Sequence, residues 1–259
     1  MGQTLEGHHA LVTGAGSGIG AAIARALASA GASVTLAGRQ AAPLEALAQE
    51  LGSARTCVAA GFDVTSRQAI EDGLAKARDR FGPVSILVNN AGQAPSAPFD
   101  KTTSDMWSKV IAVDLTGVFD VTQAVLPDLR SFGSRARIIN IASTAGLKGY
   151  AYVSAYCAAK HGVIGLTRAL AIELAATGMT VNAICPGFAD TPIISQSIEM
   201  IVAKTGRDAG DVLKEFTKAN PQGRLIDPAE IAQTVLYLVS GAARSINGQS
   251  IAIAGGEVM

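Results

Sequence analysis

The sequence predicts a doubly wound α/β fold, in which a parallel sheet is covered by helices on both faces. Short β-branched, apolar runs alternate with helical patterns along the 259 residues. The runs are continuously apolar, as expected for parallel strands buried on both faces. Hydrophobic residues make up 49% of the chain and charged residues 16%, which suits one extensive core. No linker or repeat divides the chain, so we expect a single domain over residues 1–259.

Seven segments fit the pattern of buried strands, because they are short, apolar and followed by helical or turn signals. They are residues 9–13, 33–38, 56–64, 85–92, 137–143, 180–187 and 249–256.

The helices are expected between these strands, where apolar residues recur at helical spacing. They are residues 18–30, 42–51, 66–80, 104–129, 154–177 and 228–239. Residues 192–223 interrupt the alternation with a polar, charged stretch between a strand and the last helix. We expect this stretch to be a helical insertion over the carboxyl edge of the sheet, where it would act as a substrate lid.

Composition excludes several classes of function. Lys plus Arg and Asp plus Glu both number 21, so nothing favours nucleic acid or an anionic membrane as a partner. Three scattered cysteines without a CxxC motif indicate free thiols in a reducing compartment, and we expect Cys157 to be buried. The three histidines lack metal-ligand spacing, so no metal site is expected. The polar start MGQTLEGHH is no signal peptide, and a cytoplasmic location is predicted.

A glycine-rich turn lies between the first expected strand and helix, in TGAGSGIG (13–20). Glycines allow a tight turn and a close approach of the backbone to a pyrophosphate at the start of a helix. The spacing Gly14-x3-Gly18-x-Gly20 differs from the common dinucleotide fingerprint but serves the same purpose. A plain strand-to-helix turn is the alternative interpretation.

The end of the second strand indicates which dinucleotide fits. NAD requires an acidic residue there for the ribose 2′-hydroxyl, whereas this chain reads Ala37-Gly38-Arg39-Gln40. An arginine pairs with phosphate through charge-assisted bonds. Arg39 therefore favours NADP(H), with NAD(H) as the alternative if Arg39 is only solvated.

Tyr156 and Lys160 are four residues apart in the helix expected over 154–177. Residues at this spacing share one face of a helix. A nearby cation favours the phenolate form, so the pair could transfer a proton near neutral pH. The alternative is a chance pair with a solvated lysine.

Six motifs in this order resemble those of the short-chain dehydrogenase/reductase family over essentially the whole chain. They are TGAGSGIG (13–20), DVT (63–65), NNAG (89–92), Ser143 in IINIAST, YCAAK (156–160) and CPGFADTP (185–192). The chain looks closest to the branch of 3-oxoacyl thioester reductases and aromatic polyketide ketoreductases. The resemblance implies a single-domain Rossmann fold with a seven-stranded parallel sheet, and a nicotinamide cofactor that performs the hydride step.

The resemblance also implies a role for each matching residue. Ser143 would hydrogen-bond the substrate carbonyl, Tyr156 would donate the proton, and Lys160 would lower the pKa of Tyr156 and bind the nicotinamide ribose. Residues implied to hold the cofactor are Gly14, Ser17, Gly18, Ile19 and Gly20 for the pyrophosphate and ribose, Arg39 for the 2′-phosphate, Asp63 and Val64 for adenine, Asn89, Ala91 and Gly92 for the riboses, and Pro186, Gly187 and Thr191 for nicotinamide.

One position departs from the family pattern. The family usually has an asparagine in the fourth helix that orders a proton-relay water, but IAVDLTGVF places Asp114 there. Aspartate keeps two acceptor oxygens and loses the amide donor. We expect an active enzyme with an altered relay, in which Asp114 could pair with Lys160 through water.

The sequence restricts the substrate and the binding partners less than it restricts the cofactor. The expected substrate is a small carbonyl compound or alcohol, in a pocket walled by Gln93, Ala145, Tyr150, Tyr152 and Phe188. Lys148 would either meet a carboxylate or thioester carrier or be solvated. The preferred function is the reduction of a 3-oxoacyl-type or cyclic ketone. One alternative is an NAD-dependent dehydrogenase of a small hydroxy acid or secondary alcohol. The other alternative is a dinucleotide-binding regulator. The C-terminal INGQSIAIAGGEVM resembles a segment that family members bury between subunits, which implies a homotetramer.

Overall fold

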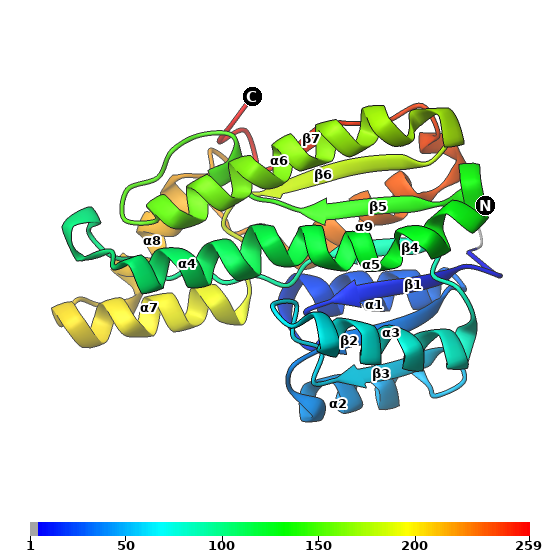
Figure 1. Cartoon of the computed structure of the whole chain (residues 1–259). Helices are drawn as coiled ribbons and strands as arrows, with labels where there is room; N and C mark the ends of the chain where they lie inside the picture. Colours follow the sequence, from blue (N-terminus) through cyan, green and yellow to red (C-terminus); the bar gives the residue numbers. More distant parts are fainter. Residues whose placement is uncertain (1–4) are drawn as a thin grey trace.

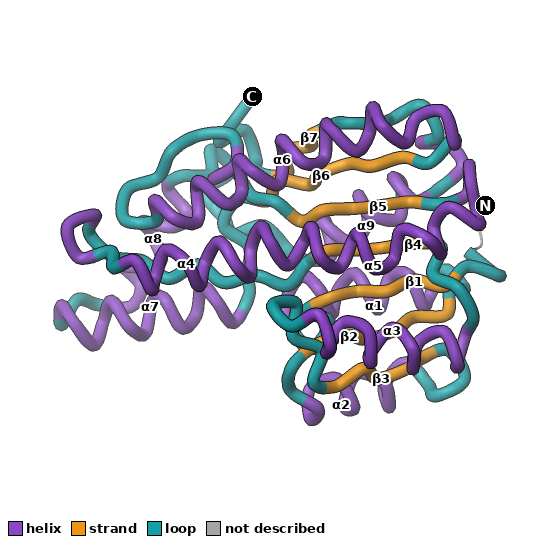
Figure 2. The backbone as a smooth tube through the Cα atoms, viewed as in Figure 1, coloured by secondary structure: helices purple, strands orange, loops and turns teal. Residues whose placement is uncertain are grey.

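The computed structural model describes residues 5–259 and contains a seven-stranded sheet in which every adjacent pair of strands is parallel (Figures 1 and 2). The predicted fold class is confirmed. The strands are β1 (His9–Thr13), β2 (Ser33–Gly38), β3 (Thr56–Ala60), β4 (Ile86–Asn89), β5 (Arg137–Ile141), β6 (Thr180–Pro186) and β7 (Ser250–Ile253). Their order across the sheet is β3-β2-β1-β4-β5-β6-β7. The polar segment 1–4 lies outside the described residues.

Helices cover both faces of this sheet, as Figure 1 shows. One face packs against α1 (Gly18–Ser29), α2 (Ala41–Leu51) and α9 (Pro228–Val239). The other packs against α3 (Arg67–Phe81), α5 (Gly117–Phe132) and α6 (Ser154–Leu174). The strands are therefore buried on both sides, which explains why they are apolar throughout rather than alternating.

The segment expected as one helix over 104–129 consists of three parts. It contains α4 (Ser104–Ile111), a π-helical turn (Ala112–Thr116) and α5. A π turn inserts an extra residue into the helix, which periodicity in the sequence does not reveal. The turn contains Asp114, the residue that departs from the family pattern.

The insertion forms two helices, α7 (Pro192–Thr205) and α8 (Ala209–Lys218), beyond the carboxyl edge of the sheet (Figure 1). Pro192 opens α7, and Gly206 ends it in the left-handed conformation at φ +68°. Asp208 caps α8 by accepting hydrogen bonds from the N–H groups of Gly210 and Asp211. The expectation of a helical insertion at this edge agrees with the structure, whereas its action as a lid stays a prediction.

One helical stretch, Ser104–Arg135, is long and apolar enough to cross a membrane by length and composition. Its apolar side chains Val121, Val125 and Leu129 are fully buried in the core beneath it. A helix that covers the core of a globular protein has the same composition, so this stretch is explained by the fold.

Candidate active site

The carboxyl ends of β1, β4, β5 and β6 meet at one edge of the sheet. The direction of strand order reverses between β1 and β4, and in open parallel sheets a ligand crevice forms at such a point. The glycine turn follows β1, the NNAG segment follows β4, and Ser143 follows β5. Most of the residues proposed from sequence therefore come together at this edge.

The glycine turn has the conformation that its residues require. Gly14 and Gly18 have φ values of +64° and +51°, which side-chain-bearing residues rarely adopt. A Cβ on Gly20 would lie 2.3 Å from the carbonyl oxygen of Gly14. Helix α1 starts here without a side-chain cap from Ser17 and without an acidic residue in its first turn. Its free N–H groups and positive end fit a pyrophosphate.

Thr13 and Asn90, for which the sequence predicted no role, connect this turn to the end of β4 by hydrogen bonds. The hydroxyl of Thr13 accepts hydrogen bonds from the N–H groups of Asn90 (2.9 Å) and Ala91 (3.0 Å). The Asn90 amide donates to the carbonyl oxygen of Thr13 at 2.9 Å. Their position within the motifs TGAGSGIG and NNAG was the only signal, because Thr and Asn are common where strands end.

Asn89, expected near the cofactor riboses, points its side chain into the core. Its amide donates to Thr122 and to Asn140, both at 2.9 Å, and Asn140 donates to Thr167 at 2.9 Å. This buried network joins β4 and β5 to α5 and α6. The structure therefore gives Asn89 a part in fixing the sheet, while Ala91 and Gly92 continue toward the site.

At the other end of the crevice, Arg39 is exposed just after β2. Asp63 accepts hydrogen bonds from the N–H (2.9 Å) and hydroxyl (2.7 Å) of Thr65. These bonds, with a smaller attraction from Arg39, hold the pKa of Asp63 below its ordinary value. Val64 is buried against Gly117, where a Cβ would stand 2.7 Å from its side chain.

Ser143 lies two residues beyond β5 and begins a short 3-10 turn, Thr144–Gly146. Its hydroxyl accepts a hydrogen bond from the N–H of Ala145 at 3.1 Å, and it lies close enough to Tyr156 to lower the pKa of that phenol against the larger effect of burial. Ala145 itself is buried in the turn.

Tyr156 and Lys160 share one face of α6, as their spacing predicted. The ammonium nitrogen of Lys160 lies 5.4 Å from the centre of the Tyr156 ring and donates to the carbonyl oxygen of Ile141 at 3.0 Å. The Lys160 side chain is only 4% exposed. Ser143, Tyr156 and Lys160 thus form one contiguous group.

The electrostatics of this group differ from the sequence-based expectation. Burial raises the pKa of Tyr156, and the lowering effects of Lys160 and Ser143 only partly offset it. Burial alone would lower the pKa of Lys160, but the attraction of Tyr156 and Asp114 outweighs it and raises that pKa. Lys160 therefore stays charged beside a phenol that keeps its proton at neutral pH.

Asp114 is fully buried and contacts Lys160 directly, at 3.5 Å from carboxylate oxygen to ammonium nitrogen. Its two oxygens also accept from the N–H of Gln93, each at 3.2 Å. Burial raises the pKa of Asp114, and Lys160 opposes that rise. Gly92 is required here, since a Cβ on it would lie 2.7 Å from the carboxylate. The expected pairing is present without an intervening water.

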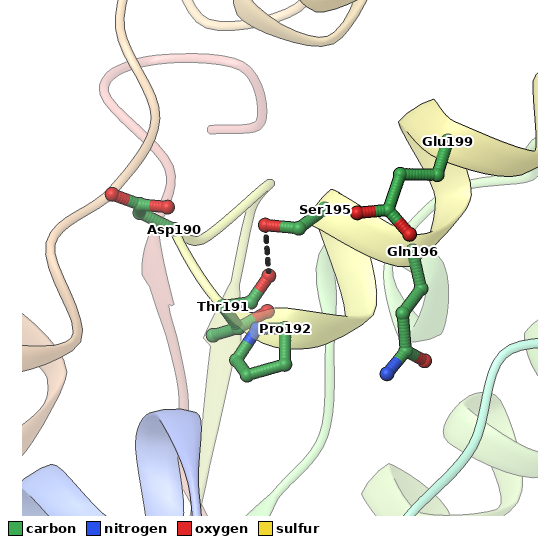
Figure 3. A pocket seen from close by; sticks show the side chains of 6 residues that line it. All are labelled: Asp190, Thr191, Pro192, Ser195, Gln196 and Glu199. Atoms are coloured by element: carbon green, nitrogen blue, oxygen red, sulfur yellow. Dashed lines mark hydrogen bonds between the residues drawn. The ribbon is translucent and has the colours of Figure 1, made fainter. Parts of the chain in front are cut away.

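A pocket of about 490 Å³ opens where α7 begins (Figure 3). Its lining residues are Asp190, Thr191, Pro192, Ser195, Gln196 and Glu199. Thr191 touches the glycine turn, with its methyl carbon 3.1 Å from where a Cβ on Gly18 would stand. Ser143, Tyr156 and Lys160 do not line this pocket, so it does not contain the catalytic group.

Aromatic side chains form a wall that runs from the loop before α6 to α8. The ring of Phe188 packs edge-on against Tyr150 (6.0 Å between centroids) and against Phe216 of α8 (5.1 Å). Phe188 follows Pro186 and Gly187, where the N–H of Gly187 donates to Ile253 at 3.0 Å. This wall connects the end of β6 to the helical insertion.

Tyr152 and Gln93 are two further residues that were expected around the substrate. Tyr152 is 66% exposed and has a positive φ of +69°, a strained conformation for an aromatic residue. The side-chain amide of Gln93 donates to the carbonyl oxygen of Lys109 in α4 at 3.1 Å. Cys157, expected to be buried, is partly exposed.

A family model described as short chain dehydrogenase matches residues 8–201. This chain belongs to the short-chain dehydrogenase family. It is 42% identical to the acetoacetyl-CoA reductase of Rhizobium meliloti over 250 residues, covering 96% of this chain and 97% of that protein. It is 38% identical to the D-beta-hydroxybutyrate dehydrogenase of Cupriavidus necator over 258 residues, covering 98% and 99%.

Among solved structures, a variant of actinorhodin polyketide ketoreductase crystallised with NADPH is similar to this chain. It superposes with a TM-score of 0.91 at 37% identity and covers 99% of both chains. The chain is therefore an oxidoreductase of a family that uses a nicotinamide cofactor. The predicted resemblance to ketoreductases is confirmed.

Proposed function

We propose that the protein reduces a ketone to a secondary alcohol with NADP(H), acting on a 3-oxoacyl-type or cyclic ketone. The observation that supports this proposal most directly is that Ser143, Tyr156 and Lys160 lie close together at the edge of the sheet where the glycine turn lies. Similarity to an acetoacetyl-CoA reductase and a polyketide ketoreductase supports the substrate class.

The nicotinamide, when bound, supplies the hydride that the carbonyl carbon accepts. Ser143 donates a hydrogen bond to the carbonyl oxygen and holds it beside Tyr156. Tyr156 donates its proton to that oxygen as negative charge develops there, which is general acid catalysis. In the oxidising direction Tyr156, as phenolate, accepts the proton of the alcohol.

Lys160 has three N–H donors, and the structure accounts for two of them. One meets the carbonyl oxygen of Ile141 and another faces Asp114. The third is available for a ribose hydroxyl of the cofactor. The positive charge also stabilises the phenolate that remains after proton transfer, because the ammonium group is buried and poorly screened by water.

Arg39 supports the choice of NADP(H). It is exposed at the end of β2, where the family places the 2′-position of the adenine ribose, and the neighbouring residues offer no carboxylate at the strand end. A guanidinium there would bind a 2′-phosphate through charge-assisted bonds.

NAD-linked oxidation of a small hydroxy acid or secondary alcohol is the second candidate. Similarity to a D-beta-hydroxybutyrate dehydrogenase at 38% identity favours it. In that case Arg39 remains solvated and makes no contact with the cofactor.

Initial rates with NADPH and NADH, over a panel of β-keto esters, cyclic ketones and hydroxy acids, separate the two candidates. We expect faster ketone reduction with NADPH. Arg39→Ala should raise KM for NADPH about tenfold or more and leave KM for NADH nearly constant, because a charge-assisted bond is worth about 1.5–3 kcal/mol. Equal KM values for NADPH in both proteins would contradict the role of Arg39.

Three further expectations belong to this proposal. The protein acts in the cytoplasm, α7 and α8 close over the substrate, and four copies assemble through the C-terminal segment. A dinucleotide-binding regulator without turnover is the rival from another class, and measured ketone reduction would exclude it.

A further inference from the structure

Glu257 is a buried carboxylate that the proposed mechanism does not use. It lies on the segment after β7, and its side chain is 2% exposed. One oxygen, Oε1, is 3.1 Å from the ammonium nitrogen of Lys148 and accepts a hydrogen bond from the hydroxyl of Tyr150. The other oxygen, Oε2, is buried and has no hydrogen-bond partner within residues 5–259. A buried acceptor without a donor is unfavourable, which points to a donor that arrives with a ligand.

Glu257 contacts two residues next to the expected substrate site, Tyr150 and Gly187. Oε2 lies 3.0 Å from where a Cβ on Gly187 would stand, directly before Phe188. Tyr150, which donates its hydroxyl proton to Oε1, accepts a hydrogen bond from the hydroxyl of Thr144 at 2.7 Å, and Thr144 is the neighbour of Ser143. The carboxylate is thus two hydrogen bonds and one peptide unit away from the serine expected to hold the carbonyl.

The cation beside Glu257 is already paired with it. Lys148 is the cation on the loop between β5 and α6, and Glu257 already engages it. The ammonium group also lies over the ring of Tyr150, 4.9 Å from its centre. Two further carboxylates, Asp190 and Glu199, line the pocket where α7 begins (Figure 3).

From this arrangement we infer that Glu257 is a specificity-determining residue, which selects uncharged ketones bearing a hydrogen-bond donor and rejects keto acids. A substrate carboxylate would meet a like charge in a poorly solvated wall. A hydroxyl or amide N–H would instead satisfy the unpartnered Oε2, and sites with buried polar groups discriminate strongly for such donors. The inference rests on the proposed reduction of ketones and narrows its substrate class to uncharged ketones that carry a hydroxyl or an amide N–H.

The charge requirement is tested with acetoacetate and methyl acetoacetate, which share a carbon skeleton and differ in charge. The readout is the ratio of their kcat/KM values within one protein, so a general loss of activity cancels. We expect the natural protein to favour the ester. Glu257→Gln, which keeps the acceptor for Tyr150, should lower that ratio about tenfold or more. Lys148→Met should raise it, because the carboxylate is then uncompensated.

The donor requirement is tested with 4-hydroxy-2-butanone and 2-pentanone, in which a hydroxyl replaces a methyl group. The natural protein should favour the hydroxyl compound, and Glu257→Leu should remove that preference. Glu50→Gln is the matched control, since Glu50 pairs with Arg25 on the exposed surface at 2.7 Å and should leave both ratios unchanged.

Two failures are distinguishable. If the natural protein reduces no ketone with either nucleotide, the proposed function is wrong and this inference falls with it. If ketones are reduced and both ratios are the same in the natural protein and the Glu257 variants, only the role of Glu257 is overturned.

Discussion

At the residue scale, Asp114 changes the electrostatics of the catalytic group. It adds a negative charge 3.5 Å from Lys160, where the family usually has a neutral amide. That charge raises the pKa of Tyr156, in addition to the larger effect of burial. A phenol that keeps its proton suits reduction, in which Tyr156 is the acid, better than oxidation, in which it must first ionise.

Asp114→Asn should therefore shift the pH profile of alcohol oxidation. Oxidation needs the phenolate, so its rate rises as pH passes through the pKa of Tyr156. Removing the negative charge lowers that pKa, and the rising limb should move to lower pH. Activity at the optimum should stay within about tenfold, since asparagine is the usual residue and general acid–base effects total about 10²–10⁴.

Rates of oxidation measured from neutral pH to above the ordinary tyrosine pKa of about 10 check this prediction. An unmoved or upward-shifted limb would contradict the coupling of Asp114 to Tyr156. Complete loss of activity would show that the carboxylate has a specific task of its own.

At the element scale, the first strand, the glycine turn and α1 depend on one close contact. Gly20 lies in the first turn of α1. A Cβ added to it would lie 2.3 Å from the carbonyl oxygen of Gly14 and 2.5 Å from the side-chain amide nitrogen of Asn90. The backbone could make room for this added Cβ only if the start of the helix moved away from β4. The turn thus needs glycine for close packing as well as for the positive φ values at Gly14 and Gly18.

Gly20→Ala should lower the melting temperature and weaken nucleotide binding, because overpacking costs about 1–3 kcal/mol and displaces the N–H groups of α1. Gly165→Ala is the matched control. Gly165 is exposed in α6 with no atom within 4 Å of an added Cβ, so alanine should stabilise the helix by about 0.5–1 kcal/mol. Thermal melts with and without NADPH measure both effects. Equal melting temperatures for the two variants would contradict the packing argument.

Sequence periodicity predicted elements well where one local pattern determined them. Helix α6 was expected from Ser154 and starts there, because alanine-rich spacing and Gly178 mark its extent. Strand β3 is shorter than expected, since Gly61 turns the chain at φ +76° after Ala60. The π turn around Asp114 was not predicted, because it depends on packing against α6 and Gly92 rather than on the local sequence.

At the scale of the whole molecule, the strand order brings distant motifs to one edge. The spacing of Tyr156 and Lys160 was readable within a single helix, and the family resemblance supplied Ser143. Glu257 could not be predicted, because its partners Lys148 and Tyr150 are more than a hundred residues away in the chain. Thr13 and Asn90 were missed for the same reason, since their bond joins β1 to β4.

The assembly state is predicted at this scale. We expect size-exclusion chromatography with light scattering to give a mass about four times that of the 26.3 kDa chain. Segment 246–259 should be part of the contact, because the resemblance implies that it is buried between subunits. A monomeric mass at micromolar concentration would contradict the prediction.

The central claim is that Tyr156 transfers the proton and Lys160 supports it. Tyr156→Phe removes only the hydroxyl, so steady-state ketone reduction by this variant tests the claim most directly. Tyr237→Phe, on the outer part of α9 and 50% exposed, is the matched control. We predict a loss of about 10²–10⁴-fold in kcat for Tyr156→Phe, with NADPH binding retained and the control unaffected. Full turnover by Tyr156→Phe would contradict the account.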